Sequence, residues 1–100
     1  MNKNNFKFIS ILLLALLLQN CTKERNQKVT VEHDCTGIYL LLSDKAYKIC
    51  NLEKVAAFPD GAIVTATFKK IKDCNNPAYS EFTCRKLYPY ESWIEVEDIQ

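Results

Sequence analysis

The feature that most limits what this chain can fold into is the apolar segment that ends at Cys21. Lys3 and Lys7 lie in a polar start, residues 8–18 form an almost unbroken apolar run, and polar residues follow Cys21. This layout is typical of a secretory signal peptide. The apolar run has about 11 residues, whereas a helix needs about 20 to cross the hydrocarbon core. We therefore expect residues 1–20 to be removed, which leaves about 80 residues and one small domain.

A cysteine at the cleavage point has a chemical use, because its thiol can be alkylated by a diacylglycerol and its freed amine can be acylated. Two or more fatty chains are sufficient for stable anchoring. On the motif Leu18-Gln19-Asn20-Cys21, residues 1–21 resemble a bacterial lipoprotein signal with its lipobox. The resemblance implies that Cys21 is lipidated and begins the mature chain. The alternative is an ordinary signal peptide with an unmodified Cys21.

The same resemblance implies a place in the cell envelope. Thr22 follows Cys21 where Asp could stand, which is compatible with transfer to the outer membrane, on its periplasmic face or its surface. Residues 21–28 are polar and show no periodicity, so we expect a tether there, followed by a domain over residues 29–100. The membrane, reached through the lipid, is the partner that this predicts, and an envelope protein is a possible second one.

The charge balance argues against nucleic acid as a partner. Without Lys3 and Lys7, 11 of the 13 basic residues remain against 12 acidic ones, and no basic run is longer than two residues. A protein that binds nucleic acid needs a basic stripe that neutralises phosphates. We therefore expect no nucleic-acid binding.

Four cysteines remain after Cys21, and an even number in a small exported domain predicts disulfides. A core of this size supplies only a few kcal/mol, so covalent links are expected. None of the pairs has the C-x2-4-C spacing of a zinc site. We expect a disulfide framework without a metal or another cofactor, built from the following residues: Cys35, Cys50, Cys74 and Cys84.

The remaining chain has the pattern of an all-β domain. Apolar runs and period-two alternation predict strands at 35–42, 46–52, 62–72, 82–88 and 93–99. Pro59-Asp60-Gly61 predicts a turn, and residues 53–58 predict at most one helical turn. Five strands in a mostly sequential meander favour a small closed or half-closed barrel. The strand count and spacing resemble an OB-fold, and an SH3-like barrel or a sandwich of two small sheets are the alternatives.

A meander also predicts which cysteines pair. If successive strands alternate in direction, Cys35 and Cys50 lie at one end of the barrel, and Cys74 and Cys84 lie at the other. The pairs Cys35–Cys50 and Cys74–Cys84 then need the least distortion. The first closes a loop of about 15 residues, which in the chain-entropy model stabilises the fold by ~3 kcal/mol.

Residues with catalytic potential are few. Glu32, His33 and Asp34 are adjacent, but in an extended strand His33 points away from the other two side chains. Such a segment is more typical of a solvated stretch near the tether than of a metal or acid–base site. The chain has two glycines and no G-x-S-x-G motif. We therefore expect a protein that is not an enzyme.

The aromatic segment 87–93 is the best candidate for a binding surface. Tyrosine and tryptophan supply large contact area with a polar group attached. Pro89 separates Tyr88 from Tyr90, and we expect Tyr90 to face solvent and Trp93 to be largely buried, where it could close the end of the barrel. Tyr88, Tyr90 and Trp93 are the predicted binding residues.

Two functions follow from these patterns. The first is a lipid-anchored, non-catalytic binding or assembly module of the bacterial cell envelope, with an unidentified ligand. The second is a small envelope inhibitor or protective protein that acts against a hydrolase. An inhibitor needs a rigid protruding loop, for which residues 75–78 between Cys74 and Cys84 are the candidate.

Overall fold

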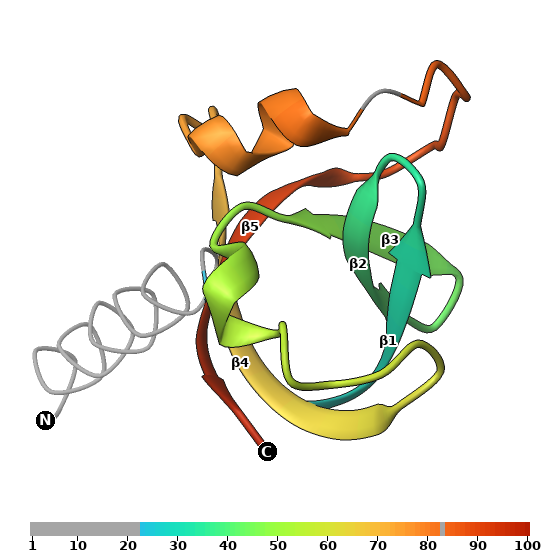
Figure 1. The fold of residues 1–100 in the computed structure, drawn as a ribbon. Helices are drawn as coiled ribbons and strands as arrows, with labels where there is room; N and C mark the ends of the chain where they lie inside the picture. Colours follow the sequence, from blue (N-terminus) through green and yellow to red (C-terminus); the bar gives the residue numbers. More distant parts are fainter. Residues whose placement is uncertain (1–22, 83) are drawn as a thin grey trace, which may run out of the picture.

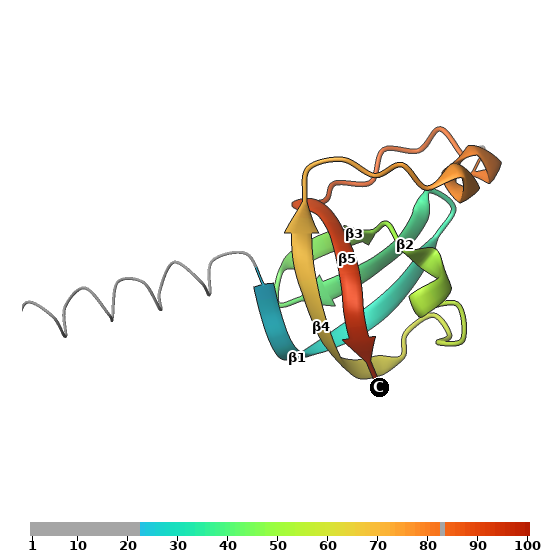
Figure 2. The ribbon, with the colours of Figure 1, turned by 90° about the vertical axis from the view of Figure 1, so that its left-hand side faces the viewer.

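Five strands close into one small barrel in a computed structural model that describes residues 23–82 and 84–100 (Figures 1 and 2). The predicted signal peptide, Cys21 and its lipid lie outside the described residues. The strands are joined around the barrel in the order β1-β2-β3-β5-β4. Their bounds are β1 Lys23–Asp34, β2 Gly37–Leu42, β3 Lys45–Ile49, β4 Ile63–Ile71 and β5 Ser92–Ile99. The prediction of an all-β, five-stranded closed barrel with two disulfides is confirmed.

The order of the strands differs from that of a simple meander, because β5 lies between β3 and β4. All neighbouring strands are antiparallel except β3 and β5, which are parallel. A short turn could join β4 to β5, yet residues 72–91 connect them by a long excursion over the outside of the barrel. We call these residues the connection. It contains the 3-10 helix η2 (Pro77–Glu81), and a second 3-10 helix, η1 (Leu52–Lys54), follows β3.

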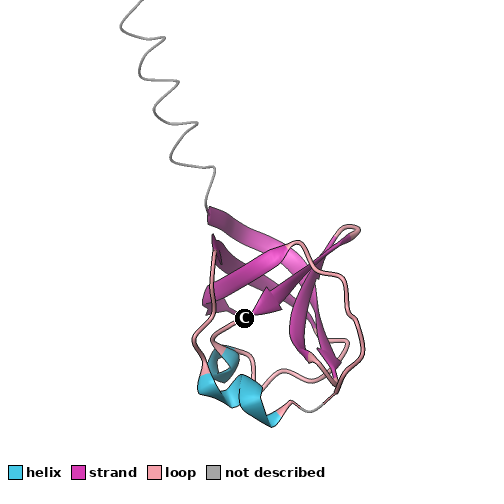
Figure 3. Ribbon diagram, turned by 90° about the horizontal axis from the view of Figure 1, so that it is seen from above, coloured by secondary structure: helices cyan, strands magenta, loops and turns pink. Residues whose placement is uncertain are grey.

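The view from above shows the strands surrounding the barrel interior and the short helices together on one side (Figure 3). Among the described residues, no helix is long and apolar enough to cross a membrane.

Alternate residues of each strand point inward and form the core. The predicted inward positions of β4 and β5 are confirmed, with Phe68 and Ile94 both 0% exposed. The Tyr47 ring from β3 packs on Phe68 with 5.4 Å between ring centroids. A barrel of five strands has no interior room beyond its own side chains. The core comprises Val29, Val31, Leu40, Tyr47, Ile49, Val55, Val64, Ala66, Phe68, Ile94 and Val96.

The tether predicted from residue 21 to residue 28 is wrong over its described part, because β1 begins at Lys23. Residues 23–30 pair with β4, and the register of this pairing shifts between Glu24 and Gln27. At this irregularity Asn26 has φ 49° and its amide donates to Thr67 Oγ1 at 3.0 Å. Pairing of this kind uses backbone groups, and therefore the polar side chains of the segment carry no periodic signal of it.

The strand predicted at 82–88 is also wrong, because these residues belong to the connection and form no strand among those described. Tyr88 packs on Tyr39 outside the barrel and Phe82 packs on Tyr79, whereas Leu87 is 88% exposed. The strand predicted at 35–42 begins two residues later. Cys35 and Thr36 instead form the tight turn between β1 and β2.

The predicted disulfide pairing is wrong as well: Cys35 pairs with Cys84, and Cys50 pairs with Cys74. The reason is the position of β5. The Cys50 amide donates to the Ile94 carbonyl at 2.9 Å, and Trp93 is the register partner of Ile71. The ends of β3 and β4 therefore flank the start of β5. The residues that follow them, Cys50 and Cys74, are close enough to form a disulfide. Cys84 is left to join the turn at Cys35.

Candidate functional site

Three outward-facing side chains form a row across neighbouring strands. Tyr39 on β2 is the register partner of Lys48 on β3, and Lys48 is the partner of Trp93 on β5. Each of the three alternates with core residues on its own strand, so all three point out of the barrel. The row therefore forms the floor of a site on the outer surface of β2, β3 and β5.

The connection covers this floor with further aromatic rings. Tyr88 stacks on Tyr39 with 3.9 Å between centroids, and Tyr39 is 0% exposed although it lies outside the barrel. Tyr79 from η2 meets Trp93 edge-on at 5.0 Å, and Tyr90 meets the same indole at 5.9 Å. The two disulfides fasten the connection at Cys74 and Cys84. A second aromatic layer is thus held against the barrel.

The ammonium group of Lys48 lies among these rings. Its Nζ is 4.9 Å from the centroid of Trp93, 5.3 Å from those of Tyr79 and Tyr90, and 5.9 Å from that of Tyr39. All four distances are within the range of cation–π attraction. Burial lowers the pKa of Lys48, and the charge of Asp34 opposes this shift in part. Among the described residues, no carboxylate forms an ion pair with Lys48.

Between the floor and the connection lies a pocket of about 340 Å³. Its size is at the lower end of the range for small-molecule sites. The lining combines aromatic rings with two lysines and a few hydroxyls, from the following residues: Thr36, Tyr39, Lys48, Tyr79, Phe82, Cys84, Lys86, Leu87, Tyr88, Tyr90 and Trp93.

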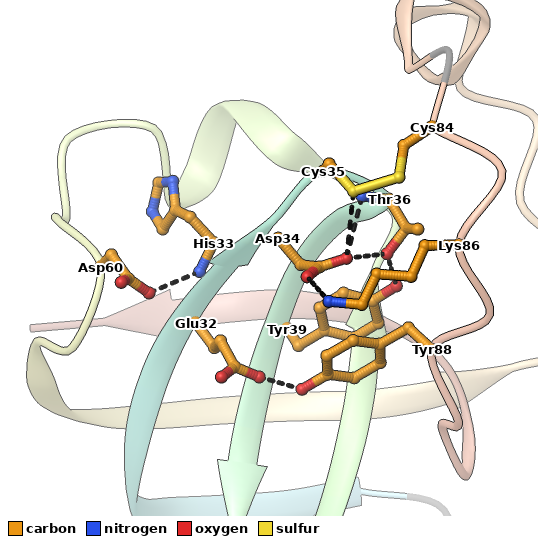
Figure 4. Close-up of polar contacts among 10 residues, drawn as sticks. All are labelled: Glu32, His33, Asp34, Cys35, Thr36, Tyr39, Asp60, Cys84, Lys86 and Tyr88. Carbon is orange, nitrogen blue, oxygen red and sulfur yellow. Dashed lines mark hydrogen bonds and ion pairs between the residues drawn. A yellow bond between two sulfur atoms is a disulfide. The ribbon is translucent and has the colours of Figure 1, made fainter.

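A polar network holds one rim of the pocket (Figure 4). Asp34 accepts hydrogen bonds from the Thr36 hydroxyl at 2.6 Å and from the Thr36 amide at 3.1 Å, and it pairs with Lys86 at 3.1 Å. The Thr36 hydroxyl and Lys86 together lower the pKa of Asp34 from 3.8 to about 2. Because the Thr36 hydroxyl uses its one hydrogen to bond with Asp34, it can only accept from the Tyr39 hydroxyl, which donates to Thr36 Oγ1 at 2.5 Å. Asp34 therefore remains ionised and joins the turn to the connection.

Gly37 permits the close approach of two pocket residues. Its φ is +151°, a backbone conformation that residues with a side chain rarely adopt. A Cβ atom here would lie 3.0 Å from Cε1 of Tyr79 and 3.2 Å from Cε of Lys48. The Tyr79 hydroxyl donates to the Ile49 carbonyl, and burial raises the pKa of Tyr79 well above its ordinary range. The start of β2 thus requires a glycine for the pocket to form.

The structure brings the three predicted binding residues together, because Tyr88, Tyr90 and Trp93 all line the pocket. Tyr90 is 42% exposed, as predicted. Trp93 is partly buried, but the prediction that it could close the end of the barrel is wrong, because its ring lies on the outer face against Tyr79. Ile94, the next residue, enters the core instead.

Sequence reasoning missed Tyr39, Lys48 and Tyr79. Tyr39 and Lys48 occupy the outward positions of the two predicted strands that contain them, and the pairing of those strands in a hairpin was available from the sequence. Tyr79 carried no signal of this kind, because only the folded connection brings it to the pocket.

The segment Glu32-His33-Asp34 divides as its alternation predicts (Figure 4). The Glu32 carboxylate accepts a hydrogen bond from the Tyr88 hydroxyl, and Asp34 belongs to the rim network. His33 points to the opposite side, where Nε2 donates to the Phe58 carbonyl at 2.9 Å. The segment lies at the end of β1, where His33 is exposed as predicted for a solvated stretch, while Glu32 and Asp34 are half-buried. In residues 23–82 and 84–100, no group of three or more acidic, histidine or cysteine side chains could hold a metal ion.

Comparisons with models of protein families, with curated proteins and with solved structures found no match. Function therefore has to be inferred from the pocket itself.

Proposed function

We propose that this protein is a lipid-anchored, non-catalytic binding module of the bacterial cell envelope, and that the aromatic pocket is its ligand site. The observation that carries the proposal is the position of the Lys48 ammonium group among four aromatic rings in an open pocket. Exposed rings are costly in water unless they contact another molecule, so an arrangement of this kind suits recognition. Cys21 supplies the membrane anchor in this proposal.

The polar groups of the pocket support binding rather than catalysis. Thr36, Tyr39 and Asp34 hydrogen-bond to one another, and the Tyr79 hydroxyl is occupied by a backbone carbonyl. These pairings fix the position of the side chains, and the low pKa of Asp34 makes its carboxylate a weak base towards the Thr36 hydroxyl. The pocket thus offers a ligand ring faces and one cation.

The location of the pocket is a further argument, by analogy of fold. OB-folds bind oligonucleotides and oligosaccharides on the face of strands two and three, between the loops that follow strands one and four. Here the pocket lies on β2 and β3, the β1–β2 turn forms one rim, and the connection after β4 forms the cover. The analogy supports a binding role without naming the ligand.

The inhibitor alternative receives less support, because it needs a loop that protrudes from the barrel. Residues 75–78 instead lie against the barrel. The Asn76 amide donates from Nδ2 to the Cys50 carbonyl at 2.7 Å, and Asn76 Oδ1 accepts from the Ala78 amide at 3.0 Å. This loop is also held by Cys50–Cys74 rather than by a bridge to Cys84.

Affinity capture from crosslinked envelopes tests the proposal. Tyr90→Ala removes an exposed ring of the pocket, and we expect the amount of captured envelope component to fall while thermal stability stays within about 1 kcal/mol of the unchanged protein. Ile63→Ala is the matched control, because Ile63 is an exposed apolar residue that does not line the pocket. Equal capture by both variants would contradict the assignment of the pocket.

Cys21→Ser tests the anchor separately. We expect the variant to leave the membrane fraction or to remain unprocessed, because the diacylglycerol has no thiol to modify. Mass spectrometry of the amino terminus checks the modification directly. An unmodified amino terminus in the unchanged protein would contradict lipidation without affecting the pocket.

A further inference from the structure

We propose that the pocket recognises a carboxylate attached to a flat ring, with the carboxylate on Lys48 Nζ and the ring against the wall formed by Tyr79, Tyr90 and Trp93. This inference rests on the proposed binding function and specifies the chemistry of its ligand. It excludes cationic ligands, which aromatic pockets often accept.

The charge preference follows from which polar groups are already paired. Lys86, the second lysine of the pocket, pairs with Asp34 at 3.1 Å. The hydroxyls of Tyr39 and Tyr88 donate to Thr36 and to Glu32. In the part of the chain that the structure describes, Lys48 forms neither an ion pair nor a hydrogen bond, so its three N–H donors are available to a ligand.

The rings around Lys48 attract its ammonium but do not replace an acceptor. Their centroids lie 4.9–5.9 Å from Nζ, which leaves space between the nitrogen and the ring faces. An amine that loses water without gaining acceptors is destabilised, and here burial already lowers the pKa of Lys48. A bound carboxylate would restore acceptors to the ammonium and form charge-assisted hydrogen bonds with it. A ligand cation would meet a like charge at the centre of the pocket.

The shape of the ligand follows from the walls. Tyr79 and Tyr90 both meet Trp93 at steep angles, 84° and 65°, so the three rings contact one another edge to face and form an aromatic wall of the pocket. A flat ring can satisfy several of these surfaces at once by stacking on one and meeting another edge-on. The pocket holds about 340 Å³, which suits a small molecule or a terminal group of a larger one.

A carboxylate fits better than a phosphate, because the site offers a single unpaired lysine. Phosphate sites use several donors, typically an arginine fork or backbone amides at a helix start together with a lysine. The rim adds no net positive charge for a doubly charged group, because Lys86 there is paired with Asp34.

Trp93 makes the test direct, since it is the only tryptophan in the chain and it lines the pocket. The full-length, disulfide-bonded protein in detergent is titrated with phenylacetate, phenylacetamide and 2-phenylethylammonium, and Trp93 fluorescence and heat of binding are recorded. These probes share a ring and differ in charge. We expect phenylacetate to bind at least about tenfold more tightly than phenylacetamide, and 2-phenylethylammonium to bind least.

Three variants assign the preference to its residue. Lys48→Met keeps an unbranched side chain, one atom shorter and without the charge, and should make phenylacetate and phenylacetamide bind equally. Lys48→Arg should retain the preference, which guards against a loss that comes from misfolding. Lys69→Met is the matched control and should also retain the preference, because Lys69 lies on β4 and does not line the pocket.

The outcomes separate this inference from the proposed function. Equal binding of all three probes, tighter binding of the cation, absence of binding by phenylacetate, or loss of the preference in Lys69→Met but not in Lys48→Met would each overturn the carboxylate assignment. The proposed function would still stand if Tyr90→Ala reduced envelope capture. Loss of that dependence on Tyr90, by contrast, would overturn the proposed function whatever the probes do.

Discussion

The barrel interior and the aromatic layer outside it are two sides of the same strands, and they are built differently. The interior is filled mainly by aliphatic side chains, most of them entirely buried. The outer layer is formed by tyrosines, Trp93 and Lys48, and it encloses an open pocket. The interior therefore supplies the stability of the fold, while the outer layer is free to serve recognition.

The two regions also differ in how they are held. The strands of the barrel are joined by backbone pairing all the way round. The connection instead depends on covalent attachment, since Cys74 and Cys84 both belong to it and their partners Cys50 and Cys35 belong to the barrel end. In this small domain, the disulfides therefore hold the pocket residues of the connection in place at least as much as they stabilise the core.

The largest effect is expected from the interior. Phe68→Ala removes a fully buried ring that packs on Tyr47, and it should cost ~3–5 kcal/mol of unfolding free energy. Urea unfolding followed by circular dichroism measures this cost. If Phe68→Ala were no more harmful than Tyr90→Ala, the assignment of stability to the interior would be wrong.

Removing the bridge between the β1–β2 turn and the connection is the next test. Cys35→Ser combined with Cys84→Ser should cost about 2–4 kcal/mol, because the bridge closes a long loop in the unfolded chain. The variant should keep the circular dichroism of the barrel while Trp93 fluorescence shifts towards that of exposed indole. Non-reducing peptide mapping of the unchanged protein provides the control, and a Cys35–Cys50 peptide there would contradict the observed pairing.

Gly37→Ala tests the fit between β2 and the connection. The added Cβ needs a strained φ and meets Tyr79 and Lys48, so the expected cost is about 1–3 kcal/mol. Trp93 fluorescence should change, since Tyr79 packs on that indole. Gly61→Ala is the control. Gly61 also has a positive φ, 86°, but a Cβ atom there would have no atom within 4 Å, so the substitution should leave the fluorescence unchanged.

The smallest effect concerns acid stability through Asp34. Its pKa is about 2 in the folded protein against 3.8 ordinarily, so its ionised form stabilises the fold at neutral pH and this contribution disappears as the pH falls from about 4 to 2. Titration of the Asp34 carboxyl by NMR measures the shift. Lys86→Met should move the pKa of Asp34 upward, though not to 3.8, because the Thr36 hydroxyl is the larger cause. An unchanged pKa in Lys86→Met would show that the ion pair contributes nothing.

The sequence by itself determined the class of the fold and much of its interior. Alternation in residues 62–72 and 93–99 placed Phe68 and Ile94 inside, since side chains of a strand point to opposite faces in turn. The turn at Pro59-Asp60-Gly61 was equally local, and there the Ala62 amide donates to the Pro59 carbonyl at 3.1 Å. The exposed Tyr90 followed from the rigidity of Pro89.

Only the tertiary structure decided which strands and cysteines are neighbours. The polar residues of β1 gave no periodic signal, because a strand that is held by backbone pairing to β4 needs no apolar face there. The insertion of β5 between β3 and β4 then redirected Cys50 to Cys74 and placed the outward-facing Trp93 beside Lys48. Alternation is a local property of a strand, whereas the choice of partner depends on the closure of the whole barrel, and the pocket is a product of that closure.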